Sequence, residues 1–257
     1  MSNLYKLCLA ICLSPIGLWA QDSIEFPIIT DRPDATESPN TVEPGYIQIE
    51  TGGYYTTFEQ DATTLETLGY NTTLLRYGLL DRLELRLGWN YEQNRSSATD
   101  LKTEGFSPML AGVKINIAHE DGRRPEIGFL GHLYLPFSAP ESLRPQGTTS
   151  DFRFAVGHTL SERSSLAYNF GGQWAEGQIG MAYVYTIAYG YALNDTIGVY
   201  GELYGDAPEL ASAHHFWDAG FTYLANGSLQ YDLTVGQSIT QGQDLLISAG
   251  VSYKFSK

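Results

Sequence analysis

The sequence predicts an all-β chain that folds into a transmembrane antiparallel β-barrel of about twelve strands, and three observations support this fold class. From Gly45 to Phe255 the chain is a series of roughly ten-residue segments in which apolar and polar residues alternate. The connections between these segments alternate between short and long, and aromatic residues gather at segment ends. This combination is typical of outer-membrane barrels.

The clearest strand runs from Asp81 to Tyr91. One of its faces carries Leu83, Leu85, Leu87, Trp89 and Tyr91, and the other carries Glu84, Arg86, Gly88 and Asn90. A period of two is that of a β-strand. In a soluble sandwich the apolar face would meet a core, whereas in a membrane barrel it would meet lipid, so one strand alone does not decide between them.

Twelve such segments are predicted, an even number as in bacterial single-chain barrels. They span residues 45–58, 69–80, 81–93, 105–118, 124–136, 149–160, 163–174, 179–193, 195–205, 213–225, 228–240 and 244–255.

The connections, taken alternately, form two sets. The short set is 80–81, 119–123, 160–163, 193–195 and 226–227, and the long set is 59–68, 94–104, 137–148, 175–178, 206–212 and 241–243. Outer-membrane barrels have short turns at the periplasmic end and longer loops outside. Both termini are therefore expected at the short-turn end.

Aromatic residues sort between the same two ends. Trp89, Trp174 and Trp217 are expected near the long loops, and Tyr191, Tyr223, Tyr253 and Phe255 near the short turns. Membrane barrels carry aromatic girdles at both interfaces. This segregation favours a membrane barrel over a soluble β-protein.

Residues 1–20 resemble a secretory signal peptide. Lys6 precedes the apolar run 7–13, and Ala20 is a small residue suited to cleavage. The run is too short to cross a bilayer, and the residues before Cys12 do not favour lipidation there. Because Cys8 and Cys12 both lie in this leader, we expect a mature chain without thiols or disulfides.

The chain is acidic, with 29 Asp and Glu against 15 Lys and Arg and a formal net charge of −14. This charge disfavours nucleic acid as a partner. Beyond the leader no stretch approaches about 18 consecutive apolar residues, so no membrane-spanning helix is expected. An exported chain of this kind can span a membrane as a closed barrel, which satisfies its backbone groups between strands.

If the apolar faces meet lipid, the opposite faces line a polar lumen. The candidate pore-lining residues are Gln48, Glu50, Arg76, Glu84, Arg86, Lys114, Glu126, Arg153, Glu202 and Asp232. Inward placement is favoured because a charge on the lipid face near the midplane would cost about 2–4 kcal/mol. Two interpretations stay open: the charges pair with one another in a closed barrel, or they line a pore and set its selectivity.

Residues 21–44 precede the first strand and are acidic. Pro27, Pro33, Pro39 and Pro44 exclude a regular helix. The segment is either a disordered periplasmic lead-in or a plug that folds into the lumen, and the first interpretation is preferred because termini are commonly disordered. The domain organisation is thus a leader (1–20), this segment (21–44) and a barrel (45–257).

A motif in this segment carries a family resemblance. Its residues are Asp31, Arg32, Pro33, Asp34, Ser38 and Pro39, followed by Pro44-Gly45 and by the run 48–52. The motif resembles the opening of a bacterial outer-membrane family of proposed transporters of the phenol-degradation meta-pathway, a family similar to the barrels of functional-amyloid secretion pores. The similarity continues through 76–79, 84–86, 112–114 and 135–136. The resemblance implies a twelve-stranded outer-membrane barrel with a transport role, and the lack of a long helical extension argues against amyloid export.

No set of residues for catalysis is evident. An outer-membrane lipid hydrolase needs a serine and a histidine within hydrogen-bond reach. His132, His158, His214 and His215 are available, but none lies beside a serine nucleophile motif, and no Gly-x-Ser-x-Gly occurs. We therefore expect no enzyme activity, and no spacing is typical of a metal or cofactor site.

These patterns predict a porin-like channel or transporter in the outer membrane of a Gram-negative bacterium, through which small solutes diffuse passively. Its expected partners are the lipid bilayer, lipopolysaccharide and a small-molecule solute. The alternative is a closed structural or adhesion barrel that binds a partner through its extracellular loops. An outer-membrane lipid hydrolase is the third hypothesis.

Overall fold

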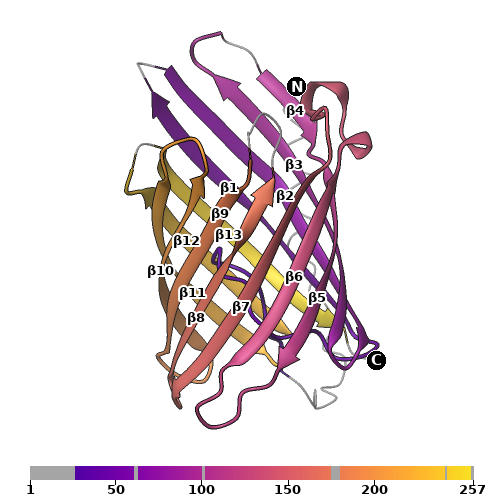
Figure 1. The fold of residues 1–257 in the computed structure, drawn as a ribbon. Helices are drawn as coiled ribbons and strands as arrows, with labels where there is room; N and C mark the ends of the chain where they lie inside the picture. The colour runs from indigo at the N-terminus through magenta and orange to yellow at the C-terminus, as the bar shows by residue number, and fades with distance from the viewer. Residues whose placement is uncertain (1–26, 61–62, 100–101, 175–179, 241, 256–257) are drawn as a thin grey trace, which may run out of the picture.

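A computed structural model describes residues 27–60, 63–99, 102–174, 180–240 and 242–255 of the chain (Figure 1). The predicted leader and its cleavage site, residues 21–26 and the predicted loop 175–178 lie outside the described residues. The described part is almost entirely β-structure, with two short 3-10 helices, η2 (Pro136–Ser138) and η3 (Glu141–Leu143). Within it no helix has the length and apolar character needed to cross a membrane.

The described strands are β1 (Ile47–Gln60), β2 (Thr63–Leu80), β3 (Leu83–Ser96), β4 (Lys102–Phe106), β5 (Met109–Ala118), β6 (Glu126–Leu135), β7 (Thr149–Ser161), β8 (Ser164–Trp174), β9 (Ala182–Ala192), β10 (Ile197–Pro208), β11 (His214–Asn226), β12 (Leu229–Ser238) and β13 (Gln243–Phe255).

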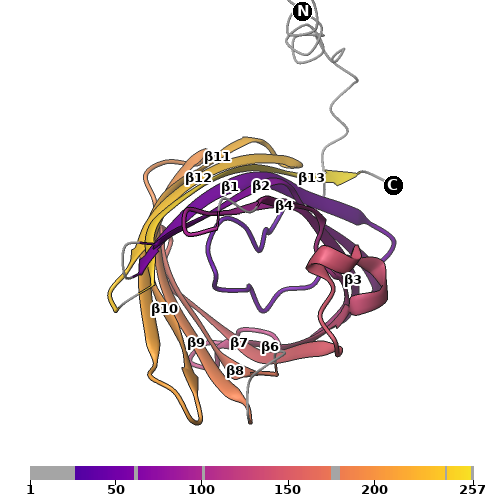
Figure 2. The same ribbon diagram turned by 90° about the horizontal axis from the view of Figure 1, so that it is seen from above.

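Twelve of these strands close into an antiparallel barrel. Each pairs with its neighbours in chain order, and β1 pairs with both β2 and β13, which joins the two ends of the sheet. Strand β4 pairs with β3 beyond the end of β5 and is an addition to the barrel. Figure 2 shows the closed wall from above. The predicted fold class is confirmed.

Side chains alternate strictly between the two faces of the wall. In β9, Val184, Thr186 and Ala188 are buried, while Tyr185 and Ile187 between them are exposed. Apolar side chains stay exposed on the outer face because that face meets lipid rather than a protein core. The exposed row of β9 continues on neighbouring strands, where Leu203 and Phe170 are also exposed.

The predicted loops 59–68 and 94–104 are wrong in part because strands extend into them. Strand β1 extends to Gln60 and β2 begins at Thr63, so most of 59–68 is paired strand, with Phe58 opposite Leu65. Threonine-rich strand ends outside the membrane need no apolar row, so this part showed no alternation in the sequence. The 18 residues of β2 exceed the roughly 9–11 that a tilted strand needs to cross a bilayer.

The predicted strand 105–118 is also wrong in its boundaries. It is divided into β4 and β5, and β4 begins within the predicted loop 94–104. Pro108 lies at the division, and proline has no backbone N–H to donate to the ladder. The pairing of β3 therefore passes from β4 (Tyr91 opposite Phe106) to β5 (Gly88 opposite Leu110).

Candidate functional site in the barrel lumen

The described part of segment 21–44 lies inside the barrel. We call residues 27–44 the lumen segment; it forms the indigo loop within the wall in Figure 2. It enters at the short-turn end, where the Ile28 N–H donates to the Gly227 carbonyl at 2.8 Å. It leaves toward β1 through Gly45, whose N–H donates to the Gly78 carbonyl at 2.7 Å.

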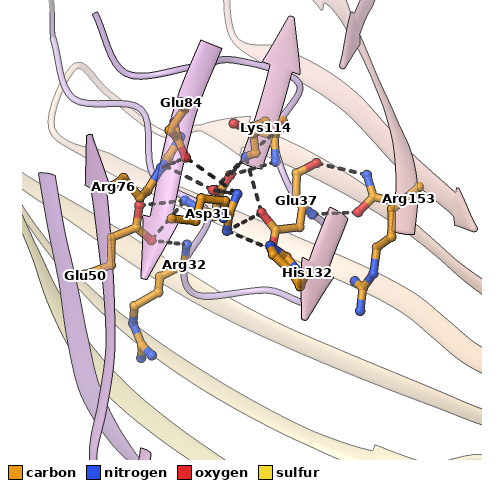
Figure 3. Close-up of polar contacts among 12 residues, drawn as sticks. Asp31, Arg32, Glu37, Glu50, Arg76, Glu84, Lys114, His132 and Arg153 are labelled. Atoms are coloured by element: carbon orange, nitrogen blue, oxygen red, sulfur yellow. Dashed lines mark hydrogen bonds and ion pairs between the residues drawn. The ribbon is translucent and has the colours of Figure 1, made fainter. Parts of the chain in front are cut away.

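Asp31 of the lumen segment is the centre of a buried charge cluster (Figure 3). Its carboxylate accepts hydrogen bonds from the Lys114 ammonium at 2.7 Å and lies 3.1 Å from both the Arg76 and the Arg86 guanidinium. These cations come from β2, β3 and β5. One carboxylate of the segment thus binds three cations of the wall.

Three further carboxylates belong to this cluster. Arg76 donates to Glu84 at 2.9 Å and to Glu50 at 2.7 Å, and Arg86 lies 2.9 Å from Glu37. A buried charge is costly unless it is paired and hydrogen-bonded. The wall supplies Glu50 and Glu84 and the lumen segment supplies Asp31 and Glu37, so the two share the compensation of the wall cations.

Wall side chains also satisfy the backbone of the lumen segment, which has no regular secondary structure of its own. Glu50 accepts from the N–H groups of Asp31 at 3.1 Å and Arg32 at 3.0 Å. The Asn169 amide accepts from the Glu37 N–H at 2.7 Å and donates to the Glu37 carbonyl at 2.9 Å. Buried backbone groups need such partners, so the wall holds the segment in one path.

The opposite wall holds the segment through Arg32 and Thr36. The Arg32 guanidinium donates to Asp232 at 2.9 and 3.2 Å and to the Ser248 hydroxyl at 3.0 Å. The Thr36 hydroxyl lies 2.7 Å from that of Thr186 and donates to Glu202. The segment therefore bridges strands from both halves of the barrel.

Glycines on the inner face allow the segment to pack against the wall. A Cβ at Gly78 would lie 2.0 Å from the Glu43 carbonyl oxygen, and one at Gly128 would lie 2.8 Å from that of Pro39. Both contacts are too short for any larger residue. Glycine in a strand often marks such a close backbone approach.

The residues of the motif make different contacts with the wall and with each other. The Ser38 carbonyl accepts from Lys114 at 2.9 Å, and its N–H donates to Asp31 at 3.0 Å. Pro39 is buried against the wall glycines, while Pro33 and Asp34 face the short-turn side of the lumen.

The candidate pore-lining residues face the lumen, and most are buried there. Gln48, Glu50, Arg76, Glu84, Arg86, Lys114, Glu202 and Asp232 are all less than 6% exposed. Arg153 is half-buried and donates to the Ala35 carbonyl at 3.1 Å. Glu126 lies nearer the short-turn end, where it is 2.9 Å from the His119 imidazole. The two interpretations of these charges placed them against each other or against solvent, whereas the structure places the lumen segment among them. For residues 27–44 this is the location of the plug alternative and not that of the preferred disordered lead-in.

Several buried lumen residues were not predicted, namely His132, Asp151, Thr186, Asp218 and Lys254. His132 was missed because β6 is apolar on both faces, with Leu130 and Tyr134 beside it on the inner face. A continuous apolar run gives no alternation, so it does not reveal which face is inward.

The predicted girdle residues lie at strand ends on the outer face, and most are strongly exposed. Trp174 and Trp217 lie at the long-loop end, where Trp89 is half-buried. Tyr191, Tyr223, Tyr253 and Phe255 lie at the short-turn end and are exposed.

Two cavities lie on either side of the lumen segment. The upper cavity, toward the long loops, has a volume of about 460 Å³ and includes Asp31 and Glu37 in its lining. The lower cavity, toward the short turns, has a volume of about 440 Å³ and includes Pro33 and Asp34. Arg32 lines both cavities, so its side chain lies at the boundary between them.

Comparisons with known proteins agree with this architecture. A family model described as "Putative MetA-pathway of phenol degradation" matches residues 30–256. No curated protein matches the sequence. The fold is similar to an outer membrane channel from Pseudomonas putida F1, with a TM-score of 0.72, 12% identity, and coverage of 86% of this chain and 99% of that one.

Two other solved structures show more distant similarity. The translocator domain of the autotransporter NalP from Neisseria meningitidis has a TM-score of 0.54 and 11% identity, covering 84% of this chain and 91% of that one. The KdgM porin has a TM-score of 0.53 and 11% identity, covering 81% of this chain and 99% of that one. At such identities the likeness concerns the fold alone.

Proposed function

This chain belongs to the family described as "Putative MetA-pathway of phenol degradation", and from that premise we propose that it is an outer-membrane channel for passive diffusion of small solutes. The observation that carries the proposal is the pair of cavities stacked along the lumen with Arg32 between them. A solute that crosses the barrel would enter the upper cavity, pass Arg32 and leave through the lower one.

The lumen segment sets the constriction of this channel. A twelve-stranded barrel is intermediate between eight strands, whose lumen is filled by side chains, and porins of 16–18 strands with open aqueous channels. The segment occupies part of the intermediate lumen and narrows the path to the surroundings of Arg32. Because ion pairs hold the segment, the constriction is polar and fixed.

The membrane setting follows from the two surfaces of the wall. The outer face exposes apolar residues over its whole circumference, which suits the hydrocarbon of the outer membrane. The short turns would face the periplasm, and the longer loops would lie among lipopolysaccharide. Diffusion through this lumen involves no catalytic step.

Single-channel recording in planar bilayers tests the proposal. The mature wild-type chain should give small steady currents, and Arg32→Ala should raise the unit conductance because it shortens the side chain between the cavities. Arg82→Ala, at the exposed β2–β3 turn, is the matched control and should leave the conductance unchanged.

A folded barrel without current would contradict the proposal. Folding is checked by heat-dependent gel mobility for every protein used. Silence from both the wild type and Arg32→Ala, with both folded, would favour the closed structural or adhesion barrel instead.

A further inference from the structure

Two neighbouring polar side chains of the upper cavity each have a buried ring or guanidinium nitrogen without a hydrogen-bond partner among the described residues. They are His132 of β6 and Arg153 of β7, shown with Glu37 in Figure 3. His132 pairs with Asp151 in the sheet register, which makes Arg153 its diagonal neighbour on the inner face. Diagonal neighbours lie roughly 7–8 Å apart, so one small molecule can contact both.

In the described part of the chain no carboxylate forms an ion pair with Arg153; Asp151, two positions away on the same face of β7, acts on it from a longer distance and is itself paired with His132. Five other lumen cations, Arg32, Arg76, Arg86, Lys114 and Lys254, each have a carboxylate oxygen within 3.1 Å. Arg153 instead donates once, to the Ala35 carbonyl, and its buried Nε has no partner among the described residues. A guanidinium carries five N–H donors, so most of this group is available to an anion.

His132 is held in place with one nitrogen facing away from its partner. Its Nδ1 lies 3.1 Å from Asp151, which also accepts the Tyr134 hydroxyl at 2.9 Å. Its buried Nε2 has no partner in the described residues. The ring packs over Gly112, where a Cβ would lie 2.4 Å from the imidazole. An imidazole N–H donates a hydrogen bond to a carboxylate.

The other carboxylates of the cavity are already engaged. Asp31, Glu37 and Glu50 belong to the ion-pair cluster, and Glu92 accepts from the Tyr54 hydroxyl at 2.8 Å. They do not lie within ion-pair distance of Arg153. Arg153 therefore offers the one guanidinium of the described lumen that an incoming anion can pair without displacing a carboxylate.

An apolar wall completes the cavity. Leu74, Leu110 and Tyr134 line it from β2, β5 and β6. Ligand pockets of about 300–1,000 Å³ typically combine apolar walls with a few polar groups that fix orientation. A volume of about 460 Å³ accommodates a single-ring molecule.

We propose that the upper cavity is a binding subsite for small aromatic carboxylates. The carboxylate of the ligand pairs with Arg153 and accepts a hydrogen bond from His132. Its ring packs against Leu74, Leu110 and Tyr134. The proposal rests on the channel function, since it names the class of solute that the channel would take. Binding itself requires no conduction, so the two proposals fail separately.

Titration calorimetry of the folded full-length mature chain in detergent tests the subsite with benzoate as the probe. Benzamide, a neutral molecule of the same shape, is the control ligand. Benzoate should bind saturably and at least about tenfold more tightly than benzamide, because a charge-assisted hydrogen bond is roughly twice as strong as a neutral one. Arg153→Gln should weaken benzoate binding about tenfold and leave benzamide binding unchanged.

Two further variants make the result specific. Arg153→Lys keeps the charge without the planar fork and should retain part of the benzoate preference, whereas His132→Gln should weaken benzoate binding less than Arg153→Gln does. Arg123→Gln, in the β5–β6 turn, removes the same charge outside the cavity and should change nothing.

The subsite is refuted if wild-type protein binds no benzoate or binds benzamide equally well. Equal weakening by Arg123→Gln would also overturn it, because the effect would then come from net charge. If Arg153→Gln fails to fold, Arg153→Lys and His132→Gln decide the question. Binding without current would refute the channel and keep the subsite.

Discussion

Asp31 shows how a single side chain organises the lumen. It is 7% exposed and shares one carboxylate among Lys114, Arg76 and Arg86. The three cations come from separate strands, and Asp31 is the one carboxylate of the cluster that pairs with all three. Loss of its charge would take the nearest carboxylate from Lys114 and one ion-pair partner each from Arg76 and Arg86 inside the buried lumen.

Asp31→Asn should therefore destabilise the barrel by about 3–5 kcal/mol, the cost typical of removing one partner from a buried ion pair. Urea unfolding in lipid vesicles, followed by tryptophan fluorescence, measures the loss. Asp81→Asn, in the exposed β2–β3 turn, should leave the unfolding midpoint where it is. Equal midpoints for wild type and Asp31→Asn would show that the cluster does not hold the lumen together.

For single residues, the sequence predicted which face of the wall a side chain occupies but not which residue it pairs with. Alternation placed Glu50, Arg76 and Arg86 on the inner face, because a charge on the lipid face is costly. It could not show that Asp31 lies between them, since the period of a strand contains no information about a segment outside the sheet. The motif around Asp31 was identified through a family resemblance, which the match over residues 30–256 confirms.

Among the elements, the lumen segment is held without regular secondary structure. Its path is fixed by wall side chains such as Asn169 and Glu50, and by glycines that let it approach the sheet. Prolines explain why the segment is not helical, and they do not specify where it lies. Its location depends on contacts between residues far apart in the sequence.

A disulfide can test the location of the segment. The hydroxyls of Thr36 and Thr186 lie 2.7 Å apart. Cysteines at both positions should therefore form a disulfide when the protein refolds in air. The mature chain is predicted to contain no other cysteine, which keeps the result simple. Mobility on non-reducing gels and mass spectrometry detect the bond.

The pair Thr36→Cys with Thr159→Cys is the matched control. Thr159 lies on the inner-face row of β7 near its short-turn end, where it donates to Glu120, and should stay unlinked. Equal cross-linking of both pairs would mean that the segment has no fixed place in the lumen.

Strand prediction succeeded and failed for the same physical reason. In β3 and β9 one face meets lipid and the other meets polar groups, so the alternation is strong. In the extensions of β1 and β2 beyond the membrane, both faces tolerate threonine and the alternation fades. In β6 both faces are apolar, which hid His132.

For the whole molecule, the apolar exterior determines where the barrel tolerates charge. Ile187 is exposed near the middle of β9, and Ile239 is exposed just beyond the end of β12 on the long-loop side. Ile187→Arg should cost about 2–4 kcal/mol of unfolding free energy in lipid vesicles, because the charge would lie near the midplane. Ile239→Arg should cost only about 0–1 kcal/mol. Similar losses at both positions would argue against a membrane around the middle of β9.

Twelve closing strands followed from an even count and from the alternation of short and long connections, and the pairing of β1 with β13 confirms that prediction. The sequence offered a plug in the lumen only as an alternative to a disordered lead-in, and it contained no pattern that decides between them. Side-chain periodicity describes a wall, whereas the two cavities depend on the three-dimensional path of a segment that has no periodicity.

The long-range contacts of Arg32 link the lumen segment to closure of the barrel. Arg32 precedes every strand of the barrel, yet Asp232 and Ser248, to which it donates, follow 200 and 216 positions later on β12 and β13. Arg32 also donates its backbone N–H to Glu50 on β1 at 3.0 Å, so its full set of contacts spans the seam between β1 and β13 and exists only in the closed barrel. A seam closed one residue out of register would place Glu50 and Ser248 on opposite faces of the wall, because a one-residue slip exchanges the two faces of a strand. The docked lumen segment thus stabilises the closed, correctly registered barrel over an open or misaligned one.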